Sequence, residues 1–412
     1  MATSSPYDQR PRLRRVLATS VAAATLLALT ACAGAGSEAE PSGEGGGLGD
    51  MTPVKLSFTT NVPAAGALGR AQTYFGEEVE KRSDGKITVE NYFSGELLPG
   101  NEVLGGVGSG IASIGFVTPF YNPTETPITY WMEGLGNELP HEIPASMTVG
   151  TAATQDLFES NEALNAEFEA QNVKVLSVAN TGPYRLACTK PIETPADAAG
   201  VTVRSNSEIW NGELASIGMV PASIPLTEVY EAMQRGVIDC WASTEASFID
   251  EGVMEFVTDF TPVNMSAPVS TAIFIMNLDE WNALPEEAQE IVQATMADAL
   301  WQWNANQIAA RAEIAGLENV EWHDPSDLND VIFEHQDQRV ENLAANAPST
   351  LDDPEAFIAE YRALLEEYSA VLDGVGATAH DLDAESIRDA YLALPDFDLE
   401  AYLDAVAEHR AR

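Results

Sequence analysis

Strands that alternate with helices constrain the fold of this chain more than any other feature. In the first half, strand-like patterns at residues 54–58, 87–92 and 111–116 are separated by helical stretches at residues 67–81 and 101–107. Such alternation is typical of βαβ units, which build a mostly parallel sheet in an α/β fold. Ligand sites in these folds lie beyond the carboxyl ends of the strands.

The second half repeats the alternation of strands and helices, with clearer signals at the ends of the elements. A predicted strand at residues 201–203 places Arg204 at its carboxyl end. A helix predicted for residues 227–235 ends at Gly236, a residue that commonly terminates helices. The next strand then starts at Val237, and residues 239–241 fall near its carboxyl end. Residues 284–317 are predicted to be mostly helical, and residues 318–412 read as short acidic helices with no chemical motif.

The N-terminal residues predict export from the cytoplasm. Residues 1–31 begin with a basic stretch and continue into an apolar run too short for a transmembrane helix, which is typical of a signal peptide. Leu29, Thr30 and Ala31 before Cys32 resemble a bacterial lipobox, whose cysteine is lipidated and becomes the mature N-terminus. An ordinary cleaved signal with an incidental cysteine is the alternative. The Gly-rich, acidic residues 32–52 suit a flexible tether.

The charge of the chain limits what it binds. Without the four arginines and the single aspartate of residues 1–31, 16 basic and 63 acidic side chains remain, a formal charge of −47. Nucleic acid and anionic lipid surfaces are repelled by such a protein. An anionic ligand therefore needs a local cation in a pocket, so every arginine in a structured segment is a candidate.

No pattern in the chain indicates catalysis. The glycine-rich residues 105–110 fit neither the dinucleotide nor the phosphate-loop pattern, and no G-x-S-x-G elbow is present. The histidines show no metal-ligand spacing; they are His141, His323, His335, His380 and His409. We therefore expect no catalytic residue, no metal site and no cofactor.

Residues 182–293 resemble the solute-binding proteins of tripartite ATP-independent periplasmic (TRAP) transporters, the DctP family. The family pattern has a KPI step, G-x-x-x-R at a strand end, a Gly-x-x-Pro-like step, E-V-Y-x-A-L, G-x-x-D and N-x-x-x-W-x-x-L-P-x-x-x-Q. The corresponding segments here are residues 190–192, 200–204, 218–221, 228–233, 236–239 and 277–293. Residues 54–317 carry the resemblance, and the last hundred residues match loosely.

The resemblance implies a two-lobed periplasmic-binding-protein (Venus-flytrap) α/β fold with a long helix linking the lobes. It places lobe I at about residues 53–180 and 267–284, and lobe II at about residues 181–266 plus later helices, within a body of residues 53–412. The acidic helical residues 318–412 complete that body.

The resemblance also implies a function. Such proteins capture a small organic acid outside the cytoplasm and hand it to TRAP membrane subunits driven by an ion gradient. We expect this chain to do so while lipid-anchored to the outer face of the cytoplasmic membrane. Two alternatives stay open: a binding lipoprotein of an ATP-driven (ABC) importer, which shares the fold, and a lipid-anchored hydrolase, which would turn over its substrate.

The expected ligand site centres on arginine. The family's carboxylate-binding arginine corresponds to Arg204, and a second family arginine corresponds to Arg185; for each, a surface ion pair is the alternative to ligand binding. Cys240, Trp241 and Ala242 replace the polar residues that many relatives carry after G-x-x-D, so those polar contacts do not carry over.

Aromatic residues complete the expected site. Trp241 is a candidate pocket wall for an apolar or aromatic ligand, with core packing as the alternative. Tyr121, Phe120 and Trp210 are weaker pocket candidates.

The remaining cysteines predict a disulfide. With Cys32 assigned to the anchor, Cys188 and Cys240 form an even pair in an oxidising compartment. We expect them to be bonded to each other; two buried free thiols are the alternative.

Overall fold

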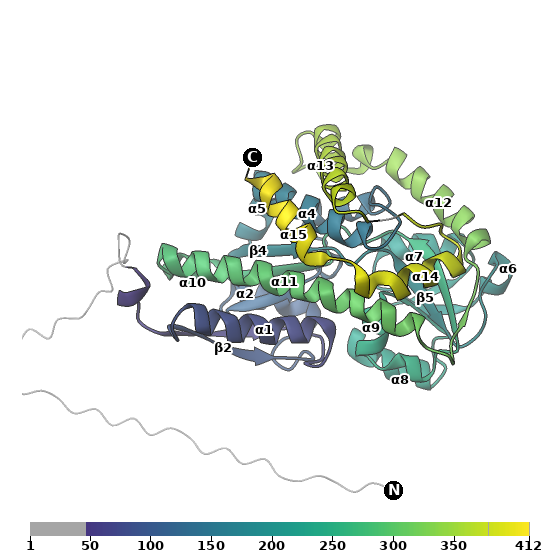
Figure 1. The fold of residues 1–412 in the computed structure, drawn as a ribbon, viewed down its shortest axis with the longest axis horizontal. Helices are drawn as coiled ribbons and strands as arrows, with labels where there is room; N and C mark the ends of the chain where they lie inside the picture. The colour runs from purple at the N-terminus through teal and green to yellow at the C-terminus, as the bar shows by residue number, and fades with distance from the viewer. Residues whose placement is uncertain (1–46, 378, 412) are drawn as a thin grey trace, which may run out of the picture. The chain divides into compact units, whose positions relative to one another are not determined.

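The strands of the folded body form two sheets, as a computed structural model shows for residues 47–377 and 379–411 (Figure 1). The predicted signal peptide, Cys32 and most of the predicted tether lie outside these described residues. Leu48 of the first 3₁₀ turn is buried, and its backbone N–H donates to Glu287 Oε2 at 2.7 Å. The folded part therefore starts before residue 53.

The first sheet, sheet A, combines four strands from the first half of the chain with one strand from the second half. Its spatial order is β2 (Ile87–Tyr92), β1 (Val54–Thr59), β3 (Ile114–Val117), β10 (Ala272–Asn277) and β4 (Val173–Ala179). Strand β1 is parallel to β2 and β3, whereas β10 is antiparallel to both of its neighbours.

The second sheet, sheet B, has the same mixed character. Its order is β11 (Glu321–Trp322), β9 (Asp259–Met265), β5 (Tyr184–Cys188), β8 (Cys240–Ser243), β6 (Thr202–Arg204) and β7 (Val220–Ala222). Strand β6 is parallel to β7 and β8, and β11 to β9, whereas β5 is antiparallel to β8 and β9.

The mixed strand directions follow from how the chain passes between the sheets. It leaves sheet A at β4 and enters sheet B at β5 four residues later, and it returns from β9 to β10 through residues 266–271. Strand β4 ends where the chain leaves sheet A and β10 begins where it returns, so these two neighbours run in opposite directions; β5 and β9 are related in the same way in sheet B. The expected mostly parallel order therefore holds for the βαβ parts, while β5 and β10 run against it.

Helices cover both sheets. The α-helices are α1 (Ala67–Arg82), α2 (Val103–Gly108), α3 (Pro127–Met132), α4 (Ala145–Ser160), α5 (Glu162–Glu169), α6 (Pro195–Ala198), α7 (Glu208–Ser216), α8 (Val229–Gln234), α9 (Glu245–Asp250), α10 (Leu278–Ala283), α11 (Glu286–Ala315), α12 (Ser326–Glu341), α13 (Pro354–Gly374), α14 (Ala384–Ala393) and α15 (Leu399–Arg410). The 3₁₀ helices are η1 (Leu48–Asp50), η2 (Gly100–Glu102), η3 (Pro119–Tyr121), η4 (Glu133–Leu135), η5 (Leu226–Glu228), η6 (Val253–Glu255), η7 (Ala344–Asn346) and η8 (Leu394–Asp396). None of the helices within the described residues is long and apolar enough to cross a membrane.

Helix α11 is the long helix expected between the lobes. It has 30 residues and packs against α1 and β4 of the sheet A side and against α9 and α14 near sheet B (Figure 1). Its buried face includes Val292, Leu300 and Trp303 of one hydrophobic core, and Ile308 and Ile314 lie in others. The long helix therefore joins the cores of both sheets.

One return link between the sheets is fixed by two buried glutamates. Glu213 accepts hydrogen bonds from the backbone N–H of Ser266, at 2.9 Å, and from its hydroxyl. Glu133 accepts from the backbone N–H groups of Val269 and Ser270, at 2.8 and 2.9 Å. Burial raises the pKa of Glu133 to about 7, although these hydrogen bonds oppose the rise.

The predicted disulfide is present. Cys188 and Cys240 lie directly opposite each other on antiparallel β5 and β8, with Cα atoms 4.1 Å apart and an S–S distance of 2.11 Å. Both residues are fully buried in the core of sheet B. The bond closes a sequence separation of 52 residues and so restricts the unfolded chain.

We predict that replacing both cysteines by alanine lowers the free energy of unfolding by about 4 kcal/mol, the loop-entropy value for a closed loop of this length. Urea denaturation of the two proteins measures the difference. In a Cys32→Ser background, thiol titration of the denatured protein should find no free thiol before reduction and two after it. Two reactive thiols without reductant would contradict the bond.

Candidate ligand-binding cleft

A cavity of about 100 Å³ lies where the carboxyl ends of strands from both sheets meet. Thr118 follows β3, Arg204 ends β6 and Ser243 ends β8, so three strands contribute their last or next residue to it. The complete lining is Asn61, Val62, Leu68, Phe116, Thr118, Phe120, Tyr121, Thr181, Tyr184, Arg204, Asn206, Leu226, Ser243, Thr244, Ser247, Asp250, Thr271, Trp303 and Gln307. The position matches the one expected for an α/β fold.

Arg204 contributes the single lysine or arginine side chain among these lining residues. It is 6% exposed, and its Nε donates to the backbone carbonyl of Ile224 at 3.1 Å. Within the described residues, no carboxylate oxygen lies within 4.0 Å of its guanidinium. Burial lowers the pKa of Arg204, which reports a desolvated cation without a full counter-charge.

Aromatic rings surround the arginine. The Tyr121 hydroxyl accepts a hydrogen bond from Asn206 Nδ2 at 3.2 Å, which joins η3 to the segment after β6. Phe120 meets the ring of Trp210 edge-on, with centroids 5.5 Å apart. Trp210 in turn stacks on Tyr184 at 4.3 Å.

Trp210 and Trp241, which were pocket candidates in the sequence, lie behind the residues that line the cavity. Trp210 supports Phe120 and Tyr184 from behind, and its indole N–H donates to the carbonyl of Ser266 at 2.8 Å. Trp241 is fully buried, and its ring centroid is 5.4 Å from the guanidinium carbon of Arg204. Trp241 therefore stabilises Arg204 through a cation–π contact.

Arg185 is also held away from the cavity lining. It is fully buried, and its Nη1 donates to the carbonyls of Pro262 and Val263 and to Asn264 Oδ1 at 2.9–3.2 Å. Glu245 lies 3.7 Å from its Nε, and the same carboxylate lies 3.1 Å from Arg311 Nη2. Arg185 thus has a buried carboxylate partner, whereas within the described residues Arg204 has none.

Among the lining residues that sequence reasoning missed are three on helices α9 and α11. Asp250 is the last residue of α9, and Trp303 and Gln307 lie one turn apart on α11. In a chain with 64 acidic residues, the pattern gave no reason to single out one aspartate. The i, i+4 spacing of Trp303 and Gln307 puts both side chains on one helix face, and this spacing was the one feature of the sequence that could have linked them.

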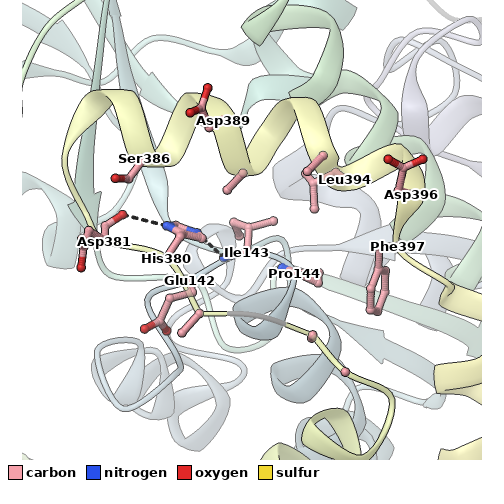
Figure 2. A pocket seen from close by; sticks show the side chains of 15 residues that line it. Glu142, Ile143, Pro144, His380, Asp381, Ser386, Asp389, Leu394, Asp396 and Phe397 are labelled. Atoms are coloured by element: carbon pink, nitrogen blue, oxygen red, sulfur yellow. Dashed lines mark hydrogen bonds between the residues drawn. The ribbon is translucent and has the colours of Figure 1, made fainter.

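A larger surface cavity does not suit an anion. It has a volume of about 790 Å³ and lies between residues 142–144 and the segment before and along α14 (Figure 2). Its lining includes four carboxylates and no lysine or arginine; the carboxylates belong to Glu142, Asp381, Asp389 and Asp396. His380 Nε2 accepts from the backbone N–H of Ile143 at 3.2 Å, so this histidine has a structural partner.

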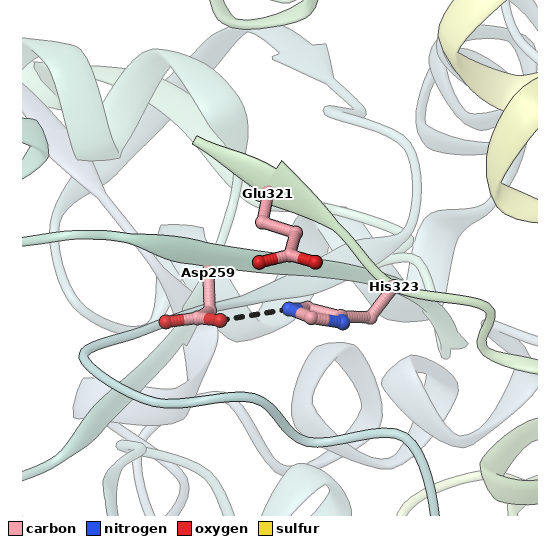
Figure 3. A group of neighbouring side chains, drawn as sticks. All are labelled: Asp259, Glu321 and His323. Carbon is pink, nitrogen blue, oxygen red and sulfur yellow. Dashed lines mark hydrogen bonds and ion pairs between the residues drawn. The ribbon is translucent and has the colours of Figure 1, made fainter. Parts of the chain in front are cut away.

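His323 lies between carboxylates at the edge of sheet B (Figure 3). Its Nδ1 is 2.7 Å from Glu193 Oε1 and its Nε2 is 2.8 Å from Asp259 Oδ1. With Glu321 beside Asp259 on the neighbouring strand, the group has the residue types of a metal site. A protonated imidazole donating to both carboxylates accounts for these contacts without a metal.

Comparison with known proteins agrees with this architecture. The fold and the cavity define an α/β protein of two sheets with a small cavity at their junction. The chain belongs to the DctP family, described as bacterial extracellular solute-binding protein, family 7, whose pattern matches residues 58–323. That family consists of binding proteins found outside the cytoplasm.

Individual relatives are distant in sequence. The monocarboxylate 2-oxoacid-binding periplasmic protein of Nostoc sp. PCC 7120 is 24% identical over 296 residues, which cover 69% of this chain and 75% of that protein. A TRAP solute-binding protein of Rhodoferax ferrireducens, solved with copurified benzoate, has 20% identity and a TM-score of 0.67, covering 77% and 99%. A Bordetella pertussis receptor binding pyroglutamic acid has 20% identity and a TM-score of 0.65, covering 75% and 100%.

We predict that alanine substitutions of the two arginines affect stability to very different extents. Arg185→Ala removes one of the two cations beside buried Glu245 and should lower the free energy of unfolding by about 3–5 kcal/mol. Arg204→Ala removes a buried cation without an ion-pair partner and should change it by less than about 1 kcal/mol. Urea denaturation without ligand tests both, and equal losses would contradict the assignment of separate roles.

We predict that His323 makes stability depend on pH. Burial lowers its pKa, but the hydrogen bonds to Glu193 and Asp259 outweigh burial, so the net pKa is raised above 6.5. The contribution of protonated His323 to the free energy of unfolding is complete below the pKa of the unfolded state, and it is lost as the pH rises through the pKa of the folded state. Denaturation midpoints from pH 6 upward should fall less in His323→Gln than in the unchanged protein, and parallel curves would exclude the effect.

Proposed function

We propose that this protein captures a small organic acid outside the cytoplasm and delivers it to the membrane subunits of a TRAP transporter. The observation that carries the proposal is Arg204, a buried cation that lines the cavity and has no carboxylate partner among the described residues. A ligand carboxylate would supply the missing counter-charge. The ligands named for the relatives, a 2-oxoacid, benzoate and pyroglutamic acid, all carry a carboxylate and support this class.

Arg204 suits a carboxylate because its guanidinium offers two parallel N–H donors that match two carboxylate oxygens. Its Nε is already bonded to the carbonyl of Ile224, which fixes the orientation of the group. The cation–π contact with the Trp241 ring also stabilises the guanidinium in this position. An incoming anion therefore meets a cation whose position is set before binding.

Ligand capture would involve closure of two lobes around the cavity. We assign residues 53–180 and 267–284 to lobe I and residues 181–266 with later helices to lobe II. Contacts between these segments lie around the cavity: Asn206 bonds Tyr121, Trp210 meets Phe120, and Asp250 Oδ2 accepts from the backbone N–H of Ala67 at 2.7 Å. These contacts exist with the lobes together, so a ligand touching both lobes favours that state.

Delivery requires the protein to stay near its transporter. We propose that Cys32 is lipidated after removal of residues 1–31 and that the Gly-rich segment behind it tethers the body to the outer face of the cytoplasmic membrane. The basic start, the apolar run and the lipobox-like LTAC support this assignment.

The test is binding of a carboxylate panel by calorimetry. We predict that Arg204→Ala weakens binding of any carboxylate ligand at least a hundredfold, because about 3–5 kcal/mol is lost when a buried charge pair is broken. Arg204→Lys keeps the charge but loses the two-donor geometry and should fall in between.

A matched control is Arg235→Ala, since Arg235 is an exposed arginine of the same lobe that pairs only with Glu231 of its own helix turn. It should bind like the unchanged protein. Circular dichroism confirms that each variant is folded. Affinity within threefold of the unchanged protein in Arg204→Ala would contradict the proposal.

A further inference from the structure

Acceptor groups gather on the part of the cavity wall formed by α9 and α11. Asp250 ends α9, and Trp303 and Gln307 lie on one face of α11, which packs against α9. Arg204, by contrast, comes from β6 of sheet B. The cavity therefore presents a cation from one element and an anion with polar and aromatic groups from two others.

The carboxylate of Asp250 has no cationic partner. Its Oδ2 accepts from the backbone N–H of Ala67, and within the described residues no lysine, arginine or histidine nitrogen lies within 4.0 Å of either oxygen. Burial raises its pKa, which shows that its charge is only partly compensated. The nearby charges that act on it are Arg70 and Glu313, and burial together with the charge of Asp250 raises the pKa of neighbouring Glu251 to about 7.

Gln307 supplies a second acceptor without a partner. The residue is 3% exposed, and its Oε1 is buried without a hydrogen bond from any described residue. Buried acceptors of this kind are costly unless a donor meets them. A donor from the ligand would satisfy Gln307 Oε1 in the cavity that it lines.

We propose that the preferred ligand is a compact zwitterion, with its carboxylate on Arg204 and a cationic nitrogen at Asp250 and Gln307. This inference rests on the proposed function and narrows its ligand class. Charged donors form the strongest hydrogen bonds to carboxylates. The indole of Trp303, which lines the same cavity, can add a cation–π contact.

The same geometry disfavours other organic acids. A second carboxylate near Asp250 would place two anions in one enclosed space, which costs free energy in a low-dielectric site. A monocarboxylate with only an apolar body would leave both acceptors without donors. The ligands named above for the relatives, a 2-oxoacid, benzoate and pyroglutamic acid, are monocarboxylic acids without a cationic nitrogen, and they do not decide the ligand of this chain.

The test compares ligands of equal shape that differ in the nitrogen. L-Proline and cyclopentanecarboxylate form one pair, and pipecolate and cyclohexanecarboxylate form a second; L-pyroglutamate offers a neutral N–H and succinate a second carboxylate. Calorimetry should show each zwitterion binding at least tenfold more tightly than its partner, with L-pyroglutamate between L-proline and cyclopentanecarboxylate and succinate weakest.

Variants separate ligand recognition from structural roles. Asp250→Asn keeps an oxygen that can accept from Ala67 but removes the charge, so it should weaken zwitterion binding at least tenfold and leave the donor-free acids within threefold. Gln307→Met should act in the same direction with a smaller effect. Glu318→Gln removes an exposed negative charge just after α11 that neither lines the cavity nor acts on Asp250, and it serves as the control, with both ligand types unchanged.

The outcomes are distinguishable. Equal binding of zwitterions and donor-free acids, or binding of succinate or donor-free acids alone, overturns the inference and leaves the role of Arg204 intact. Equal loss of both ligand types in Asp250→Asn assigns Asp250 to helix capping and also overturns it. Failure of the unchanged protein to bind any carboxylate contradicts the proposed function itself.

Discussion

A buried glutamate between two buried arginines holds sheet B to the helices that cover it. Glu245 of α9 faces Arg185 of β5 and Arg311 of α11, and the Tyr391 hydroxyl of α14 donates to it while accepting from Arg185. Four elements distant in sequence thus meet at one carboxylate. Any arrangement that separated these groups would leave an unpaired charge in the core, which costs much free energy. The charge cluster therefore favours a single arrangement of the four elements. It also withdraws Arg185 from the cavity and leaves Arg204 as the available cation.

Much of the architecture could be predicted from local pattern. The expected strand at residues 87–92 matches β2, and the helix at residues 67–81 and the long helix after Leu284 differ from α1 and α11 by one or two residues. These elements carry strong periodicity and clear end signals. The strand expected from Val237 begins instead at Cys240, because turn residues after Gly236 precede the pairing with β5. The antiparallel strands β5 and β10 depend on long-range pairing that local pattern does not encode.

Candidate residues could be predicted only where a residue type is rare or a pattern marks the position. Cys188 and Cys240 stood out in a chain with three cysteines, and Arg204 stood out as a cation at the carboxyl end of a predicted strand. The structure places Tyr121 and Phe120 in the lining, but it places Trp210 and Trp241 one layer behind it. Sequence identifies large aromatic residues, whereas their depth depends on tertiary packing. Asp250 and Gln307 belong to abundant residue types, so only their position in the folded chain distinguishes them.

The enclosed position of Arg204 has a kinetic consequence. One buried cation has little influence beyond the cavity, whereas the formal charge of −47 on the chain without residues 1–31 produces a negative potential around the whole protein. A free anion must approach against this potential, and its association rate should rise with ionic strength as the field is screened. A neutral molecule meets no such barrier. Discrimination by net charge would thus begin at distances of about a Debye length, roughly 10 Å at 0.1 M salt, before any contact forms.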